Sequence, residues 1–332
     1  MGEAKHNGWA VDVEDLVKTF GSFTAVDHIS LRVGKGEIFG FLGPNGAGKS
    51  TTIRMLCGIL APSAGKGTVN GFDIFTQTEK IKENIGYMSQ KFSLYEDLKV
   101  EENLEFYSGI YRLPDGIKKA RKEWALQMAG LQDRRKALTR DLAGGWKQRL
   151  ALGCAILHEP SILFLDEPTS GVDPLSRRSF WDLIYEMAGK GVTVFVTTHY
   201  MDEAEYCARL ALINQGRIIA LGTPAELKTK YMPETVWELE TDRLQDALDA
   251  LKNQITEFPP DGIRPGAQGV AVFGNTLHIV SRHEEDLSAG IRALLKPRDI
   301  SIKRLEPIEP SLEDVFVSLI EKTGEKGNKN GV

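Results

Sequence analysis

Two kinds of apolar run recur along this chain. Residues 38–42, 161–168 and 192–197 are apolar until each run ends at or beside polar residues, which is typical of strands buried in a parallel sheet. Residues 9–16 instead alternate apolar with acidic side chains, which indicates a strand with one exposed face. A further strand is predicted at residues 25–33, before a glycine turn. The first part of the chain therefore combines strands that are predicted to be fully buried with a strand that has one face exposed to solvent.

Helical spacing fills the intervals between the strands. Large apolar side chains recur three and four positions apart over residues 100–137, and apolar residues continue over 150–157. Another helix is predicted over residues 174–188, between two of the buried strands. The alternation predicts an α/β fold with an all-helical insertion at about residues 95–160.

The pattern changes near Pro233, and we place a domain boundary at residue 230. Residues 231–322 are predicted to form a small α+β domain, and residues 323–332, which are rich in Gly, Lys and Asn, a flexible tail. The predicted elements are a strand at 236–240, a helix at 243–253, a hairpin at 269–280, a helix at 284–295 and a strand at 300–304. This region has no Gly-rich loop and no cluster of His, Cys or paired carboxylates, so we expect the chemistry in residues 1–230.

A phosphate-binding loop is predicted at Gly43–Ser50, between the strand at 38–42 and a helix. Its glycines allow the backbone to turn tightly and to direct N–H groups at phosphate oxygens, and the following helix adds its positive end. Lys49 is placed to reach the β- and γ-phosphates, and Ser50 to offer its hydroxyl to Mg²⁺. An ordinary Gly-rich turn is the alternative, and the flanking strand and helix argue against it.

Polar residues stand where several predicted strands end. Asp166 and Glu167 end one buried strand, His199 follows another, and Gln90 follows a shorter one. Because ligands bind at the carboxyl ends of strands in α/β sheets, Asp166 is predicted to hold Mg²⁺ and Glu167 to face the water that attacks the γ-phosphate. From the pattern alone, a surface glutamine and a structural histidine remain alternatives for Gln90 and His199.

Two further features have less specific interpretations. Gly144 and Gly145 open a helix, and this pair either offers bare N–H groups to an anion or makes a tight helix start. Phe20 lies between two predicted strands, where the pattern favours burial in the core over stacking on a nucleotide base.

Composition narrows the classes of partner. The chain has 41 basic and 46 acidic residues and a net charge of -5, so nucleic acid is not an expected partner. Cys57, Cys154 and Cys207 are far apart and form no C-x-x-C pair, which argues against both a disulfide framework and a zinc site. No apolar run approaches the length of a bilayer span, so a membrane would be met through a partner.

These motifs occur once each in a fixed order, and together residues 9–229 resemble the nucleotide-binding subunit of ABC transporters. The resemblance implies a P-loop ABC ATPase domain with an antiparallel β subdomain and a helical subdomain, and it makes Phe20 the adenine-stacking residue. The implied catalytic residues are Glu167, His199, Gln90 and Lys49. The implied ATP-binding residues are Phe20, Gly43, Asn45, Gly46, Ala47, Gly48, Lys49, Ser50, Thr51, Gly144 and Gly145. The implied Mg²⁺ ligands are Ser50, Gln90 and Asp166.

Three other segments, at residues 88–98, 200–205 and 310–316, resemble the branch that serves exporters with ABC-2-type permeases, including drug-efflux ATPases. The family signature usually reads Leu-Ser-Gly-Gly-Gln, whereas this chain has Leu142-Ala143-Gly144-Gly145-Trp146, and the departure that matters is Ala143 in place of the serine. In the family that hydroxyl meets the γ-phosphate held by the opposite subunit. We therefore expect a weakened but functional composite site.

The resemblance also implies partners and a location. Two copies are expected to enclose two ATP molecules and to drive separate permease subunits from the cytoplasmic side of the cell membrane. A non-transport ATPase of the same fold, acting on ribosomes or nucleic acid, is the main alternative, although such proteins usually carry fused ATPase halves, coiled-coil insertions or basic extensions. A small-molecule P-loop kinase would leave Gln90, the glycine pair and His199 unexplained.

Overall fold

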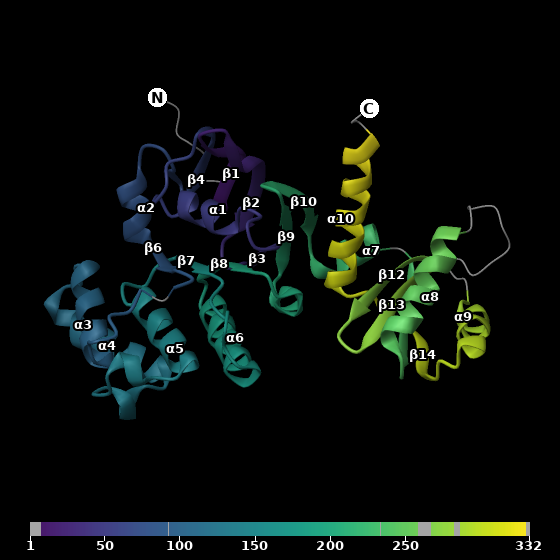
Figure 1. The fold of residues 1–332 in the computed structure, drawn as a ribbon. Coiled ribbons are helices and arrows are strands. Elements are labelled where there is room, and N and C mark those ends of the chain that lie inside the picture. Colours follow the sequence, from purple (N-terminus) through teal and green to yellow (C-terminus); the bar gives the residue numbers. More distant parts are fainter. Residues whose placement is uncertain (1–7, 92, 233, 258–266, 282–285, 330–332) are drawn as a thin grey trace. The chain divides into compact units, whose positions relative to one another are not determined.

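The computed structural model describes residues 8–91, 93–232, 234–257, 267–281 and 286–329. The chain forms two compact units, Met1–Pro224 and Ala225–Val332 (Figure 1). The domain boundary predicted at residue 230 falls inside helix α7 (Pro224–Tyr231), at the start of the second unit.

A largely parallel sheet lies at the centre of the first unit, with strand order β10-β9-β3-β8-β7-β6. The neighbours from β9 to β6 pair in parallel, and β10 pairs with β9 in the antiparallel sense. The strands are β3 (Ile38–Leu42), β6 (Ile85–Met88), β7 (Ile162–Asp166), β8 (Thr193–Thr198), β9 (Arg209–Asn214) and β10 (Arg217–Gly222). Every residue of β3, β7 and β8 is buried, which confirms the parallel-core prediction.

The register of this sheet brings the predicted polar positions to one edge. Leu42 of β3 pairs with Thr198 of β8, and Asp166 of β7 pairs with Thr197 of β8. Because the strands are parallel, the segments that follow them begin at the same edge. The glycine loop after β3, the carboxylates at the end of β7 and the histidine after β8 are therefore neighbours.

A second, antiparallel sheet in this unit has the order β2-β1-β4-β5. Its strands are β1 (Trp9–Phe20), β2 (Phe23–Gly34), β4 (Ala64–Val69) and β5 (Phe72–Asp73). The turn between β1 and β2 contains Gly21 at φ 58, and the flanking Phe20 and Phe23 are 50% and 63% exposed. The core position that the pattern favours for Phe20 is wrong, because the side chain stands at a hairpin tip.

Helices cover both faces of the parallel sheet (Figure 1). Side chains of α1 pack in one core cluster with β3 and β7, whereas those of α5 and α6 pack in another with β7 and β8. The predicted helical insertion is formed by α3, α4 and α5, which share a further apolar cluster. The helices of this unit are α1 (Lys49–Leu56), α2 (Thr78–Asn84), α3 (Val100–Ile110), α4 (Asp115–Ala129), α5 (Gly144–Ala155) and α6 (Pro174–Gly189).

The second unit is an α+β structure, as predicted, with the antiparallel strand order β12-β13-β11-β14. Helices α8 and α9 pack on the sheet, since Leu251 of α8 and Leu295 of α9 lie in one apolar cluster with Ile279 of β13. Its strands are β11 (Thr235–Thr241), β12 (Ala267–Phe273), β13 (Thr276–Ser281) and β14 (Ile302–Ile308). Its other helices are α8 (Leu244–Glu257), α9 (Ser288–Leu295) and α10 (Leu312–Lys329). The start of the helix predicted at 284–295 lies partly outside the described residues.

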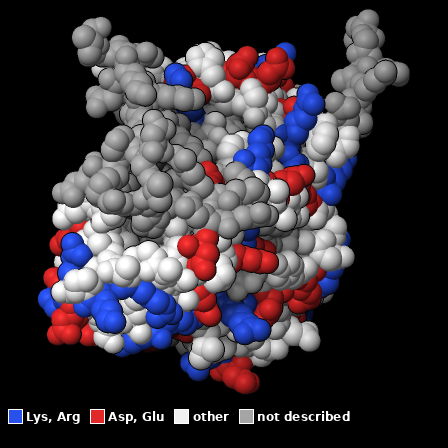
Figure 2. All heavy atoms as spheres, turned by 90° about the vertical axis from the view of Figure 1, so that its right-hand side faces the viewer, with Lys and Arg blue, Asp and Glu red and all other residues white. Residues whose placement is uncertain are grey.

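Helix α10 continues to Lys329, through most of the segment predicted to be a flexible tail, and residues 330–332 lie outside the described part. On the face drawn in Figure 2, basic and acidic side chains are interspersed. None of the helices in the described part of the chain has both the length and the apolar composition that a bilayer span requires.

Candidate functional site

The glycine loop after β3 lies tightly against neighbouring backbone. A Cβ atom at Gly43 would lie 2.2 Å from the carbonyl oxygen of Ile213, and one at Gly48 would lie 2.6 Å from that of Ala25. Gly48 also has φ 106 and Gly46 has φ 81, in the left-handed region that favours glycine. These positions therefore require glycine for local reasons, and the loop is fixed in place by β9 and β2.

Helix α1 begins immediately after the loop and directs unpaired backbone donors at the same edge of the sheet. Gly48 is its N-cap, and no side chain caps this end. The first amides of a helix have no partner within it, so those of Lys49, Ser50 and Thr51 are available to an anion, and the helix dipole favours negative charge there. Of the other predicted loop residues, Asn45 is exposed and Ala47 is buried.

Lys49 is the cation of the site and is 4% exposed. Its Nζ donates hydrogen bonds to the carbonyl oxygens of Gly43, at 2.7 Å, and Pro44, at 3.1 Å. The same Nζ lies 3.1 Å from Oε1 of Glu167. The lysine is thus held inside the loop and in contact with the predicted catalytic carboxylate.

Asp166 lies beside the hydroxyl that follows Lys49. Its Oδ1 accepts hydrogen bonds from Ser50 Oγ at 3.0 Å and from Thr197 Oγ1 at 2.8 Å. Burial raises the pKa of the Asp166 carboxyl, although both hydrogen bonds oppose the shift. Thr197 was not identified from the sequence. The only available signal was its place at the end of a buried strand.

The oxygen donors of Ser50 and Asp166 fit a magnesium ion, which prefers hydroxyl, carboxylate and water oxygens. Within the described residues, no group of three or more His, Cys, Asp or Glu side chains is arranged to hold a metal ion. A Mg²⁺ ion at this position would therefore need further ligands from water or from phosphate oxygens of a nucleotide. Gln90, the third predicted ligand, joins the site through Glu167.

Three predicted side chains converge on Glu167, which is 5% exposed. Besides Lys49 on Oε1, its Oε2 accepts a hydrogen bond from Gln90 Nε2 at 2.9 Å and lies 3.2 Å from His199 Nδ1. Its backbone N–H donates to the carbonyl and hydroxyl oxygens of Thr197. Glu167 has φ 47, a costly conformation for a residue with a side chain, and such strain concentrates at functional sites.

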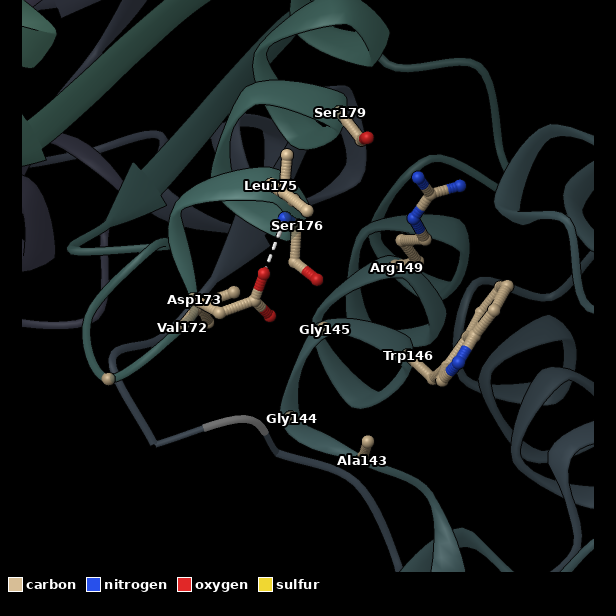
Figure 3. Close-up of a pocket in the computed structure, with 11 residues that line it drawn as sticks. Ala143, Gly144, Gly145, Trp146, Arg149, Val172, Asp173, Leu175, Ser176 and Ser179 are labelled. Carbon is tan, nitrogen blue, oxygen red and sulfur yellow. Dashed lines mark hydrogen bonds between the residues drawn. The ribbon is translucent and has the colours of Figure 1, made fainter.

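The predicted glycine pair lies in a separate pocket of about 420 Å³ in the same unit, drawn in Figure 3. A Cβ at Gly145 would lie 2.7 Å from Ser176 Oγ of α6, whereas a Cβ at Gly144 would meet nothing within 4 Å. Gly145 thus allows α5 to approach α6, and Gly144 leaves the amides at the start of α5 open to a ligand. Ala143 is the N-cap of α5 and makes no side-chain cap.

Trp146, another residue of this pocket, was not predicted as functional. Two guanidinium groups lie over its ring, that of Arg134 at 5.0 Å and that of Arg149 at 5.4 Å from the ring centroid. It also packs near Gly130, at the end of α4. Arg134 and Gly130 precede Trp146 in a different part of the insertion, so sequence spacing gave no signal for this arrangement.

The sequence also matches families of known proteins. Residues 26–170 match the model described as "ABC transporter", and residues 222–320 match "ATP-binding protein DrrA1-3-like, C-terminal domain". A shorter match, to an AAA domain, covers residues 147–201.

Two curated relatives show how far these similarities extend. The linearmycin resistance ATP-binding protein LnrL of Bacillus subtilis is 35% identical over 320 residues, which cover 94% of this chain and 99% of that protein. The probable multidrug ABC transporter ATP-binding protein YbhF of Escherichia coli is 52% identical over 220 residues. That alignment covers 66% of this chain and only 38% of the longer E. coli protein.

A solved structure shares the fold of about two thirds of this chain. It is cbiO1 of Clostridium perfringens, which is described as part of the ABC transporter complex cbiONQ. The TM-score is 0.63 at 30% identity, and the match covers 68% of this chain and 92% of that one.

Proposed function

Because this chain belongs to the family of ABC transporter ATP-binding proteins, we propose that it is the ATP-hydrolysing subunit of an exporter. The observation that carries the proposal is the convergence of Lys49, Gln90 and His199 on the carboxylate of Glu167. This cluster lies where a glycine loop and a helix N-terminus favour phosphate.

In the proposed reaction, the loop amides and Lys49 bind the β- and γ-phosphates of ATP. Glu167 accepts the proton of the water that attacks the γ-phosphorus, and the bond from that phosphorus to the β,γ-bridging oxygen breaks, giving ADP and phosphate. Gln90 and His199 orient the carboxylate through the contacts described above. Mg²⁺, held by Ser50 and Asp166, would neutralise charge on the phosphates.

We further propose that the complete site needs two copies of the chain. The pocket at the start of α5 exposes helix amides, and the described residues that line it include Arg149 but no lysine comparable to Lys49. It is suited to receive the γ-phosphate of an ATP bound to the glycine loop of a second copy. Exposed Phe20 is proposed to stack on the adenine.

The proposal extends to a membrane permease of the ABC-2 type, met at the cytoplasmic side of the cell membrane. LnrL is named for linearmycin resistance and YbhF for multidrug transport, which supports export of a small-molecule drug. The second unit matches the DrrA-like C-terminal domain, which also supports the exporter branch.

The test is affinity purification of the tagged chain from detergent-solubilised membranes, followed by measurement of ATP turnover in the isolated complex. We expect a multi-span membrane protein to co-purify, and we expect Glu167→Gln to retain it while losing turnover. Recovery of ribosomes or nucleic acid in place of a membrane protein would contradict the exporter proposal and favour a non-transport ATPase.

A further inference from the structure

A buried carboxyl group connects the two loops that carry Glu167 and His199. Glu203 lies in the short 3-10 helix Met201–Tyr206, which follows His199, and it is 0% exposed. Its Oε1 accepts a hydrogen bond of 2.5 Å from the hydroxyl of Thr169, which is also 0% exposed and follows Glu167 closely in the sequence. One side-chain contact therefore joins the segment after β7 to the segment after β8.

Arg177, in the first turns of α6, connects the same group to His199. Its Nε lies 3.6 Å from Oε1 of Glu203, and its guanidinium lies over the ring of Tyr200 at 4.0 Å from the centroid. The Tyr200 ring is in turn 4.1 Å from the ring of His199. A continuous series of contacts thus runs from Glu203 to the histidine that faces Glu167.

The cluster formed by Glu203, Thr169, Arg177 and Tyr200 is not the arrangement that stability alone would favour. Arg177 Nε is buried and has no acceptor within hydrogen-bond distance among the described residues, since Glu203 Oε1 lies 3.6 Å away. Burial also raises the pKa of the Glu203 carboxyl, which shows that its charged form is disfavoured there. Apolar side chains would fill such a position at lower cost, so the polar contacts are better explained by a need to fix the two loops.

The chain segment that contains Thr169 also connects the catalytic carboxylate to the wall of the glycine-pair pocket. After Thr169 the chain turns, with Val172 N–H bonded to the Thr169 carbonyl, and reaches Asp173, which caps α6 by accepting from Ser176 N–H. Val172, Asp173 and Ser176 line the pocket, as Figure 3 shows. A shift of Thr169 would therefore move both Glu167 and one wall of the pocket.

We propose that Glu203, with Arg177, is a positioning residue for ATP hydrolysis, which sets His199 and the segment after Glu167 in their working arrangement. This inference rests on the proposed function. Glu203 acts through Thr169 and Tyr200 and contacts no reacting atom. Its predicted effect is on the rate of the chemical step, with ATP affinity largely unchanged.

The test compares Glu203→Ala, Glu203→Gln and Thr169→Val in the full-length chain, with Thr193→Val as the matched control. Thr193 is likewise buried and accepts a hydrogen bond, from Gly36 N–H at 2.9 Å, but it lies at the opposite end of β8. We expect Glu203→Ala and Thr169→Val to lower kcat by about tenfold or more with KM for ATP within about twofold. Glu203→Gln, which keeps the acceptor oxygen, is expected to restore most of the rate, and the control is expected to keep it.

Thermal unfolding of each variant separates positioning from stability. If Glu203→Ala does not fold, Thr169→Val carries the test. Folded Glu203→Ala or Thr169→Val proteins with the kcat of the parent would overturn the inference, as would an equal loss of kcat in Thr193→Val. If the parent chain hydrolyses ATP and Glu167→Gln does not, such a result would refute the positioning role alone. A parent chain without ATP turnover would refute the proposed function and the inference together.

Discussion

Ala143 provides the most discriminating perturbation of the glycine-pair pocket. It is the N-cap of α5, with φ -63 and ψ 156, the backbone conformation in which a serine side chain caps a helix. Ala143 is exposed, and the position of a Cβ at the next residue, Gly144, has nothing within 4 Å. A serine hydroxyl at position 143 can therefore accept a hydrogen bond from its own helix while it donates one to a phosphate oxygen.

The size of the effect follows from these two roles. A serine N-cap in place of alanine stabilises a helix by about 1 kcal/mol. A hydrogen bond to a charged phosphate contributes about 1.5 to 3 kcal/mol, which corresponds to roughly ten- to 150-fold in an equilibrium constant. We therefore expect Ala143→Ser to stabilise the first unit slightly and to prolong the ATP-bound dimer by about that factor.

Ala143→Asp is the matched control because aspartate caps a helix as well as serine does. Its carboxylate only accepts hydrogen bonds, and its charge would repel a phosphate. The assay is dimer lifetime by size-exclusion chromatography with ATP, together with ATP turnover and thermal unfolding. Equal dimer lifetimes in Ala143→Ser and Ala143→Asp, or no change in lifetime or turnover in Ala143→Ser, would refute the reasoning.

Two further predictions concern stability. Gly43→Ala places a methyl group against the Ile213 carbonyl, so it should lower the free energy of unfolding by about 1 to 3 kcal/mol and abolish ATP binding. The control is Gly109→Ala on α3, where the methyl group would meet no neighbouring atom and should be neutral or stabilising. Equal melting temperatures of the two variants would contradict this prediction. Burial raises the pKa of Glu203 in the folded chain above its usual 4.5. At pH values between 4.5 and this raised pKa, the folded state therefore binds more protons than the unfolded state. The contribution of Glu203 to stability falls as pH rises through this range. The melting temperature of Glu203→Gln relative to the parent should therefore be higher at pH 8 than at about pH 4.5, and a pH-independent difference would contradict this sign.

The central site was predictable because few topologies satisfy its strand pattern. Asp166, Glu167 and His199 stand at the ends of apolar strands, and parallel pairing must bring such ends to one edge. The pattern cannot show which side chains touch there, and the contact between Gln90 and Glu167 depends on a loop conformation.

Other features depended on distant neighbours that no local pattern contains. The exposure of Phe20 follows from a tight hairpin, and the surroundings of Trp146 come from another part of the insertion. Glu203 lies in a segment, residues 200–205, that resembles the exporter branch, but only the fold shows that its carboxylate contacts Thr169. Helix α10 was not predicted, although Leu312, Val315 and Leu319, which are buried in the structure, recur at helical spacing.

The central claim is that Glu167 activates water in an ATP site completed by a second copy of the chain. The most direct test is Glu167→Gln, which keeps the size of the side chain and removes its capacity as a base. With ATP and Mg²⁺ we expect the variant to bind nucleotide, to accumulate as a dimer by light scattering and to turn over ATP about a hundredfold or more slowly. A variant that hydrolysed ATP at the parent rate, or that bound ATP and remained monomeric, would contradict the account.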